Sequence, residues 1–234
     1  MASRSLVWRS AKCEPQRSGF TLVELLVVVA IIAVLAMLLM PAAKGFIDKG
    51  KTAKCAANLK TLAVGALRYA GENNGRLPAA NANDVAGPHK SWHHAALGDT
   101  NSYTDARKGP DVMYCPCMEW PQRDGSIAPP FDYSYGINVR IAGVSYTNNA
   151  QSIRLQRLAK PSQVILLADG ACYDEDNGHA WQLDNRGSGT KNYISKKNHG
   201  GGANVAWADG HVTFESAGSV SNLMSPVNTT NWIP

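Results

Sequence analysis

The longest apolar stretch of the chain lies between Gly19 and Pro41. Residues 20–40 carry a single charge, Glu24, near the start of the run. At about 1.5 Å per residue, a helix of this length is roughly 31 Å long, which matches the hydrocarbon core of a bilayer. Buried helices of soluble proteins are normally shorter, and a signal peptide has its small residues after the apolar run, not before it. The pattern predicts a transmembrane helix over 20–41, with Glu24 as a functional candidate because a carboxylate in a membrane is costly.

After Pro41 the apolar residues recur at steps of three and four, which is the period of an amphipathic helix. The stripe consists of Cys55, Leu59, Leu62, Ala66 and Tyr69. An Asn-Asn-Gly sequence at 73–75, followed by Pro78, predicts the end of the helix. We expect residues 42–74 to continue the membrane helix as its amphipathic part. Proline removes one helical hydrogen bond, so we also expect a kink at Pro41.

The remaining residues, 75–234, are expected to form a head domain. Residues 76–130 are rich in Pro, Gly, Asn and Asp and show little periodicity, which is typical of loops. Residues 163–168 (QVILLA) have the composition of a buried strand, and 203–215 (ANVAWADGHVTFE) that of a β-hairpin. The predicted fold class is therefore α+β, with a long N-terminal helix, first transmembrane and then amphipathic, packed against a small antiparallel sheet.

Asp209-Gly210 is a turn signal within this hairpin. A two-residue turn at this point would pair Val205 with Phe214 and, one step closer to the turn, Trp207 with Val212. We therefore expect these four large apolar side chains to share one face of the sheet.

The charge distribution argues against nucleic-acid binding. The net charge is +5, and residues 1–19, with four basic residues and one acid, account for three of these positive charges. The basic residues of this leader are Arg4, Arg9, Lys12 and Arg17. No stripe of basic residues interleaved with aromatics follows, so we expect no nucleic-acid partner.

Gly19-Phe20-Thr21-Leu22-Val23-Glu24, with the basic leader before it and Pro41 after it, resembles the cleavage and methylation site of type IV prepilins and type II secretion pseudopilins. The resemblance implies a pilin-like fold and removal of the leader, residues 1–19, by prepilin peptidase. The cut falls between Gly19 and Phe20, and Phe20 is then N-methylated. It also implies that Glu24, the fifth mature residue, pairs with the α-amino group of an adjacent subunit and sets the axial register of the filament.

The same resemblance implies a structural subunit of a type IV pilus-like or type II secretion pseudopilus filament. Its partners are then prepilin peptidase, other pilin or pseudopilin subunits and the bacterial inner membrane. The chain crosses that membrane once, with a cytoplasmic N-terminus and a periplasmic head, before it enters the filament. The leader's basic residues favour this orientation, but the lysines after the apolar run oppose it, so the orientation rests on the resemblance.

The alternative function is a membrane-anchored periplasmic module that binds a glycan or an exported substrate. The aromatic residues available to it include Trp92, Trp120 and Trp181. No phosphate-binding loop, nucleophile elbow or HExxH motif is present, so we expect no enzymatic activity.

A second resemblance concerns the segment from His199 to Asp209-Gly210. It is similar to the C-terminal His-x9-Asp-Gly motif of a large group of bacterial pseudopilin-like proteins. The physical interpretation of the motif is hairpin construction, with His199 more plausible as a hydrogen-bonding anchor of its loop than as a catalyst.

Two groups of residues are candidate metal ligands. Asp169, Asp174 and Asp176 follow a buried strand, and oxygen ligands on a loop suit Ca²⁺, although a solvated acidic loop is the simpler interpretation. The sequence establishes no cofactor, and Ca²⁺ is the candidate for this loop. His89, His93 and His94 are close in sequence, but no third ligand is placed by spacing, so zinc binding there is a weak hypothesis.

Five cysteines are present, and Cys13 belongs to the leader. The other four, Cys55, Cys115, Cys117 and Cys172, allow three full disulfide pairings in an oxidising compartment. A bridge from Cys115 or Cys117 to Cys172 and free thiols in the core are both plausible, whereas Cys55 is expected to pack on the helix stripe.

Overall fold

The computed structural model describes residues 19–80, 92–98, 110–117, 134–143, 152–172, 182–184, 192–196 and 198–223. The chain divides into two compact units, Met1–Gly45 and Phe46–Pro234, and each is described by itself. In the first unit, Leu22–Met40 has a mean hydropathy of 3.1 and none of its side chains is buried. Among the described residues it is the one helix long and apolar enough to cross a membrane. This agrees with the predicted single-pass anchor.

Helix α1 (Leu22–Glu72) contains both predicted helical segments. Its backbone is helical at Pro41, and a kink there remains a prediction. In the second unit, the stripe residues Cys55, Leu59, Leu62 and Ala66 are fully buried, as their spacing predicted, whereas Tyr69 is half-buried. The helix ends where Asn74 and Gly75 adopt positive φ values of 55° and 77°, and the Gly75 N–H donates to the carbonyl of Ala70.

The second unit also contains a six-stranded sheet with β2 (Ile165–Cys172) at its centre. The strand order is β3-β1-β2-β5-β6, and β4 also pairs with β2. The other strands are β1 (Tyr135–Asn138), β3 (Gln182–Leu183), β4 (Asn192–Ile194), β5 (Gly202–Trp207) and β6 (Val212–Ser216). The pairs are antiparallel except for β1 and β3, which are parallel. The predicted pilin-like α+β fold, a long helix packed on a small and mainly antiparallel sheet, is therefore confirmed.

Short helices fill the connections of the head. They are α2 (Trp92–Leu97), η2 (Asp111–Met113), α3 (Val139–Ala142), η3 (Leu155–Arg157), η4 (Pro161–Gln163), η5 (Asn198–Gly200) and α4 (Ala217–Leu223).

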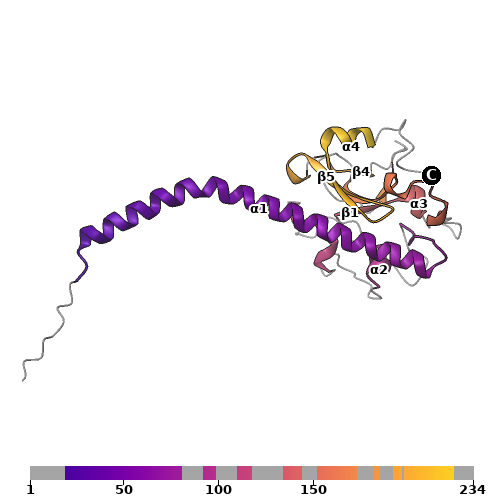
Figure 1. Ribbon diagram of the computed structural model, residues 1–234, viewed down its shortest axis with the longest axis horizontal. Helices are drawn as coiled ribbons and strands as arrows, with labels where there is room; N and C mark the ends of the chain where they lie inside the picture. Colours follow the sequence, from indigo (N-terminus) through magenta and orange to yellow (C-terminus); the bar gives the residue numbers. More distant parts are fainter. Residues whose placement is uncertain are drawn as a thin grey trace, which may run out of the picture. The chain divides into compact units, whose positions relative to one another are not determined.

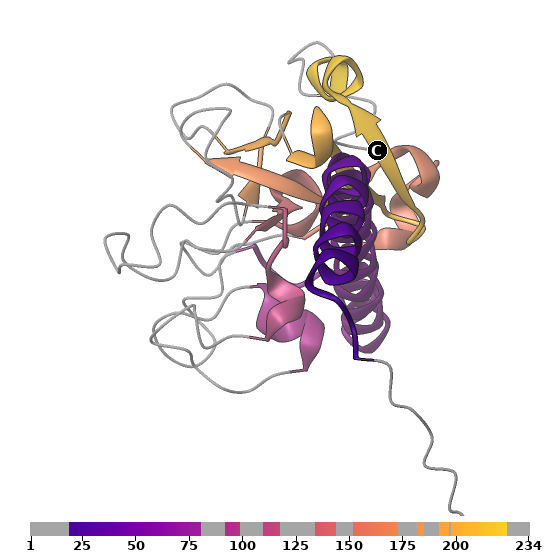
Figure 2. The same cartoon turned by 90° about the vertical axis from the view of Figure 1, so that its left-hand side faces the viewer.

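Within the described part of the head, one hydrophobic cluster lies on each face of the sheet. The larger cluster joins the second half of α1 to α2 and to side chains of β1, β2 and β5, including Leu59, Ile137 and Ala206. The smaller cluster lies on the other face and includes Val205 of β5 and Val220 of α4. Figure 1 shows this order, with α1 on one side of the strands and α4 on the other. Figure 2 shows the same elements after a turn of 90° about the vertical axis.

The predicted register of the β5–β6 hairpin is wrong by one residue. Val205 is paired with Thr213, and Ala206 with Val212. The turn contains three residues, 208–210, because Gly210 adopts a φ of 88° and its N–H donates to the Trp207 carbonyl. A shift of one residue moves a side chain to the other face of a sheet, so Val212 packs against the larger cluster while Val205 and Trp207 belong to the smaller one.

His93 of α2 is a buried histidine that should make the stability of the head depend on pH. It is fully buried, its Nε2 lies 3.0 Å from the Tyr135 carbonyl oxygen, and its ring stacks on Trp92. Burial and the neighbouring His94 lower the pKa of His93 well below its usual value, although the hydrogen bond to Tyr135 opposes this shift. The folded head therefore resists protonation that the unfolded chain accepts, and stability is lost as the pH falls below about 6.5.

We expect urea midpoints of the full-length protein in detergent, followed by tryptophan fluorescence, to fall between pH 7.5 and pH 5. In His93→Gln, which lacks the titrating group, the fall should be smaller. His211→Asn is the control for loss of an exposed histidine; because its pair with Asp209 lies at the surface and contributes little, the dependence should stay close to wild type. Equal pH dependence in wild type and His93→Gln would contradict the prediction.

Candidate functional site

The N-terminal motif lies at the start of α1, where the chain changes from non-helical backbone to helix. Gly19, Phe20 and Thr21 precede the helix, and the Phe20 side chain is 82% exposed. A peptidase needs an accessible, non-helical bond, and the bond between Gly19 and Phe20 meets both conditions in the described residues.

Thr21 and Glu24 form a capping box at this point. The Glu24 N–H donates to Thr21 Oγ1 at 3.3 Å, and the Thr21 N–H donates to Glu24 Oε2 at 2.9 Å. The Thr21 hydroxyl also donates to Oε2, at 2.8 Å. Each side chain thus satisfies a backbone N–H that the first helical turn leaves without a partner. Sequence reasoning missed this role of Glu24, although the Thr-x-x-Glu signal was present in the motif.

The box leaves Glu24 able to make a further interaction. Its hydrogen bonds all use Oε2, and within the described part of the chain Oε1 has no hydrogen-bond partner. The donor from Thr21 is a backbone amide that cleavage after Gly19 would leave intact. The capping box is therefore compatible with the predicted pairing of Glu24 with an α-amino group, which the structure does not test.

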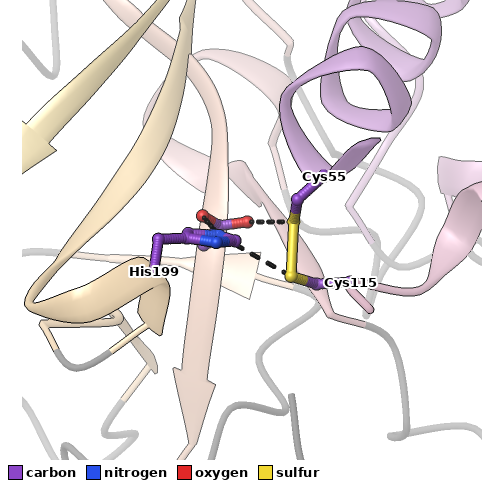
Figure 3. Close-up of side chains that lie close together, drawn as sticks. Cys55, Cys115 and His199 are labelled. Carbon is purple, nitrogen blue, oxygen red and sulfur yellow. Dashed lines mark hydrogen bonds and ion pairs between the residues drawn. A yellow bond between two sulfur atoms is a disulfide. The ribbon is translucent and has the colours of Figure 1, made fainter. Parts of the chain in front are cut away.

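A second candidate site lies inside the head, where four polar side chains from distant segments converge. Cys55 comes from α1, Cys115 follows η2, Asp169 belongs to β2 and His199 to η5. Their ligand atoms all lie within 4.8 Å of one another. Figure 3 shows the imidazole of His199 and a carboxylate facing the two sulfur atoms.

Cys55 and Cys115 form a disulfide across a separation of 60 residues, with their Cα atoms 5.1 Å apart. The bridge attaches α1 to the segment after η2. Cys55 packs on the buried stripe as expected, but the sequence did not predict that it is also bridged to Cys115. Helical spacing placed Cys55 on the buried stripe, but it could not show which loop crosses that stripe. The predicted bridge from Cys115 to Cys172 is therefore wrong, and the alternative from Cys117 to Cys172 involves a side chain outside the described residues.

His199 and Asp169 are in direct contact beside the disulfide. The Nε2 atom of His199 lies 2.8 Å from Asp169 Oδ2, and both side chains are 0% exposed. The Asn204 N–H donates to the same oxygen at 2.7 Å. A buried carboxylate is costly unless it is hydrogen-bonded or paired, and these two contacts supply that compensation. His199 thus anchors its loop to the central strand, as expected for a hydrogen-bonding role.

The backbone of η5 aims His199 at this contact. His199 adopts a left-handed conformation with φ 56° and ψ 34°, and Gly200 and Gly201 that follow also have positive φ. Such a conformation is uncommon for a non-glycine residue and is found where the surrounding structure requires it. Here the surrounding contacts are those of the buried imidazole.

Cys117 and Tyr135 border the cluster. The Sγ atom of Cys117 lies 3.1 Å from His199 Nδ1, and the Tyr135 hydroxyl lies 3.0 Å from Cys55 Sγ. Burial raises the pKa of Cys117, so this thiol is mainly protonated at neutral pH and is a poor nucleophile. Burial, together with the charge of Asp169, also raises the pKa of Tyr135, which keeps its hydroxyl available as a donor.

The other motif residues lie at the opposite end of β5 from His199. Asp209 Oδ1 accepts hydrogen bonds from the His211 N–H and ring. Slight burial would raise the pKa of Asp209, but these hydrogen bonds lower it overall. The Gly210 carbonyl accepts from Lys60 Nζ of α1, and a Cβ at Gly210 would lie 3.2 Å from Leu67. The motif therefore secures both ends of one strand rather than forming one site.

The structure describes only some of the other residues predicted to bind a metal or a glycan. Asp169 points into the sulfur-containing cluster, whereas Asp174 and Asp176 lie outside the described residues, as does His89. Trp92 is fully buried and offers no surface to a glycan, and Trp120 and Trp181 also lie outside the described residues.

Comparison with known proteins identifies a family motif in the N-terminal segment. Residues 15–40 match the family described as the prokaryotic N-terminal methylation motif. No curated protein and no solved structure matches the chain. The chain therefore carries a prepilin-type processing motif that covers Gly19, Phe20 and Glu24 and most of the apolar segment.

Proposed function

We propose that this protein is a structural, non-enzymatic subunit of a type IV pilus-like or type II secretion pseudopilus filament. Prepilin peptidase cuts it between Gly19 and Phe20, and Phe20 is then N-methylated. The observation that carries the proposal is the methylation motif at residues 15–40, which coincides with an exposed non-helical segment leading into an apolar helix.

The apolar helix has two successive roles in this proposal. It first anchors the subunit in the inner membrane, with the leader in the cytoplasm and the head in the periplasm. It then packs against the helices of other pilin or pseudopilin subunits in the filament core. Both environments are apolar, which suits a 19-residue segment whose side chains are all exposed in the single chain.

We further propose that the head belongs to the pseudopilin-like group with a C-terminal His-x9-Asp-Gly motif. The motif residues have structural roles here, since His199 contacts Asp169 and the Asp209-Gly210 turn contacts α1. These contacts hold the hairpin on the helix that joins the head to the filament.

Replacement of Gly19 tests the processing step. We expect Gly19→Val to block removal of the leader, because the added side chain would occupy the peptidase site next to the scissile bond. A Cβ at Gly19 would meet no atom of the chain within 4 Å, so the substitution should not disturb the protein itself. Mass spectrometry of the membrane fraction should find the uncut precursor, whereas wild type should begin at methylated Phe20.

Gly45→Val is the matched control for this experiment. Gly45 also has no atom within 4 Å of an added Cβ, but it lies outside the matched motif. This variant should be cut and methylated as in wild type. Removal of the leader from Gly19→Val, or a wild-type N-terminus elsewhere than Phe20, would refute the proposed processing.

A further inference from the structure

We propose that the head binds one Zn²⁺ through Cys55, Cys115, Asp169 and His199 when the two cysteines are reduced. The Cys55–Cys115 disulfide and the bound metal are then alternative states of one site. The starting observation is that four ligand atoms from four separate segments lie within 4.8 Å of one another in the interior of the head. This inference does not depend on the proposed filament function.

The distances between unlike ligand atoms fit one tetrahedral ion. With Zn–S bonds of about 2.3 Å and Zn–N or Zn–O bonds of about 2.0 Å, a sulfur and a nitrogen or oxygen ligand lie roughly 3.5 Å apart. The Cys115 Sγ atom lies 3.6 Å from His199 Nε2, and Cys55 Sγ lies 3.4 Å from Asp169 Oδ1. Reduction frees the two sulfur atoms to rotate about their Cα–Cβ bonds and so to separate around the ion.

The ligand chemistry selects zinc over calcium. Two thiolates, one imidazole and one carboxylate are a set typical of Zn²⁺, whereas Ca²⁺ requires six to eight oxygen ligands. The set is also enclosed, since Cys55, Cys115 and Asp169 are buried and the His199 side chain is 0% exposed. Four protein ligands without an open position are characteristic of a structural zinc site.

A second layer of contacts already orients each kind of ligand. The Asn204 N–H holds Asp169 Oδ2, which leaves Oδ1 toward Cys55. With Nε2 on the metal, His199 carries its proton on Nδ1, which lies 3.1 Å from Cys117 Sγ. Partners of this kind fix the tautomer and the ring orientation of a zinc-bound histidine.

Tyr135 completes this layer at the other sulfur. Its hydroxyl lies 3.0 Å from Cys55 Sγ, which is close enough to donate a hydrogen bond to a thiolate at that position.

Conversion between the two states is a two-electron exchange with an external dithiol or disulfide. A dithiol reductant supplies two electrons and two protons to the disulfide, which becomes two thiols while the reductant becomes a disulfide. Zn²⁺ then displaces both thiol protons to solvent as the two Zn–S bonds form. In the reverse direction, a protein disulfide oxidant takes two electrons from the thiolates and two protons from solvent and becomes a dithiol, while the S–S bond forms and Zn²⁺ is released.

Cobalt titration of the full-length protein in detergent tests the site. After reduction and removal of metals under anaerobic conditions, we expect one Co²⁺ per chain to bind. It should give thiolate-to-cobalt charge-transfer absorption and the visible bands of tetrahedral Co²⁺, and Zn²⁺ should displace it. Oxidised protein, with the disulfide verified by mass spectrometry, should give neither absorption.

Single substitutions identify the ligands. Cys55→Ser and His199→Asn should weaken Co²⁺ binding and change its spectrum, and asparagine is chosen because it tolerates the left-handed backbone. Tyr135→Phe should weaken binding by about tenfold while keeping the tetrahedral spectrum, as expected for a partner outside the ligand shell. His211→Asn removes an exposed histidine outside the cluster and should bind Co²⁺ as wild type does. Circular dichroism of each variant verifies folding.

Two results would overturn the proposal. One is that folded, reduced wild type binds no tetrahedral Co²⁺. The other is that folded Cys55→Ser and His199→Asn both keep the wild-type affinity and spectrum, which would place the metal elsewhere. If neither variant folds, the cadmium-113 NMR spectrum of reduced wild type is the test. A chemical shift outside the range of thiolate-bound cadmium would also exclude the site.

Discussion

Glu24→Leu is expected to leave cleavage and methylation intact but to remove the subunit from filaments. In the filament core the carboxylate would be surrounded by apolar helices, where it is tolerated only if a cation neutralises it. In the proposed filament, the α-amino group created at Phe20 of an adjacent subunit would supply that cation. Leucine offers no partner to the amine, so the axial register is lost. The measurement is the amount of each variant in sheared filaments relative to its mature pool in the membrane.

Glu24→Gln separates charge pairing from helix capping. Glutamine retains an oxygen that accepts from the Thr21 N–H, so it preserves the capping box seen in the structure, but it lacks the negative charge. We expect this variant to be matured and to fail in assembly, as Glu24→Leu does. Thr21→Val is the converse control, since it removes the hydroxyl of the box and keeps the carboxylate, and it should assemble. Normal filaments from Glu24→Gln would show that capping, not charge, is the requirement.

Removal of the Cys55–Cys115 disulfide is expected to destabilise the oxidised head by about 4 kcal/mol, because the bridge closes a loop of 60 residues and restricts the unfolded chain. The Cα separation of 5.1 Å is within the normal range for a disulfide, so the bridge requires no backbone movement. The double variant Cys55→Ala/Cys115→Ala, in full-length protein in detergent, should show this loss in urea denaturation followed by tryptophan fluorescence.

Cys117→Ala is the control for loss of a nearby thiol. Cys117 is half-buried and is the free cysteine among the described residues. Its removal should cost well under half of the effect of the double variant, because no loop is opened. Equal stability of the double variant and wild type under non-reducing conditions would contradict a stabilising bridge.

The helix was predictable from local sequence, and the hairpin register was not. Burial on α1 follows the spacing of Cys55, Leu59 and Leu62, since helical periodicity alone decides which residues share a face. The hairpin turn depended on the backbone conformation of Gly210, which contacts α1. A local turn signal could not include that contact, so the predicted pairing was one residue out.

By itself, the sequence determined the processing motif, the apolar anchor and the amphipathic stripe of α1, because each depends on residues close together along the chain. It also marked His199, Asp169 and the cysteines as candidates, but it assigned them to separate roles. Only the tertiary structure decided that Cys55, Cys115, Asp169 and His199 share one site. Their segments are joined by the order of strands in the sheet and by the path of the loop after η2 across α1, and these long-range contacts leave no periodic signal in the sequence.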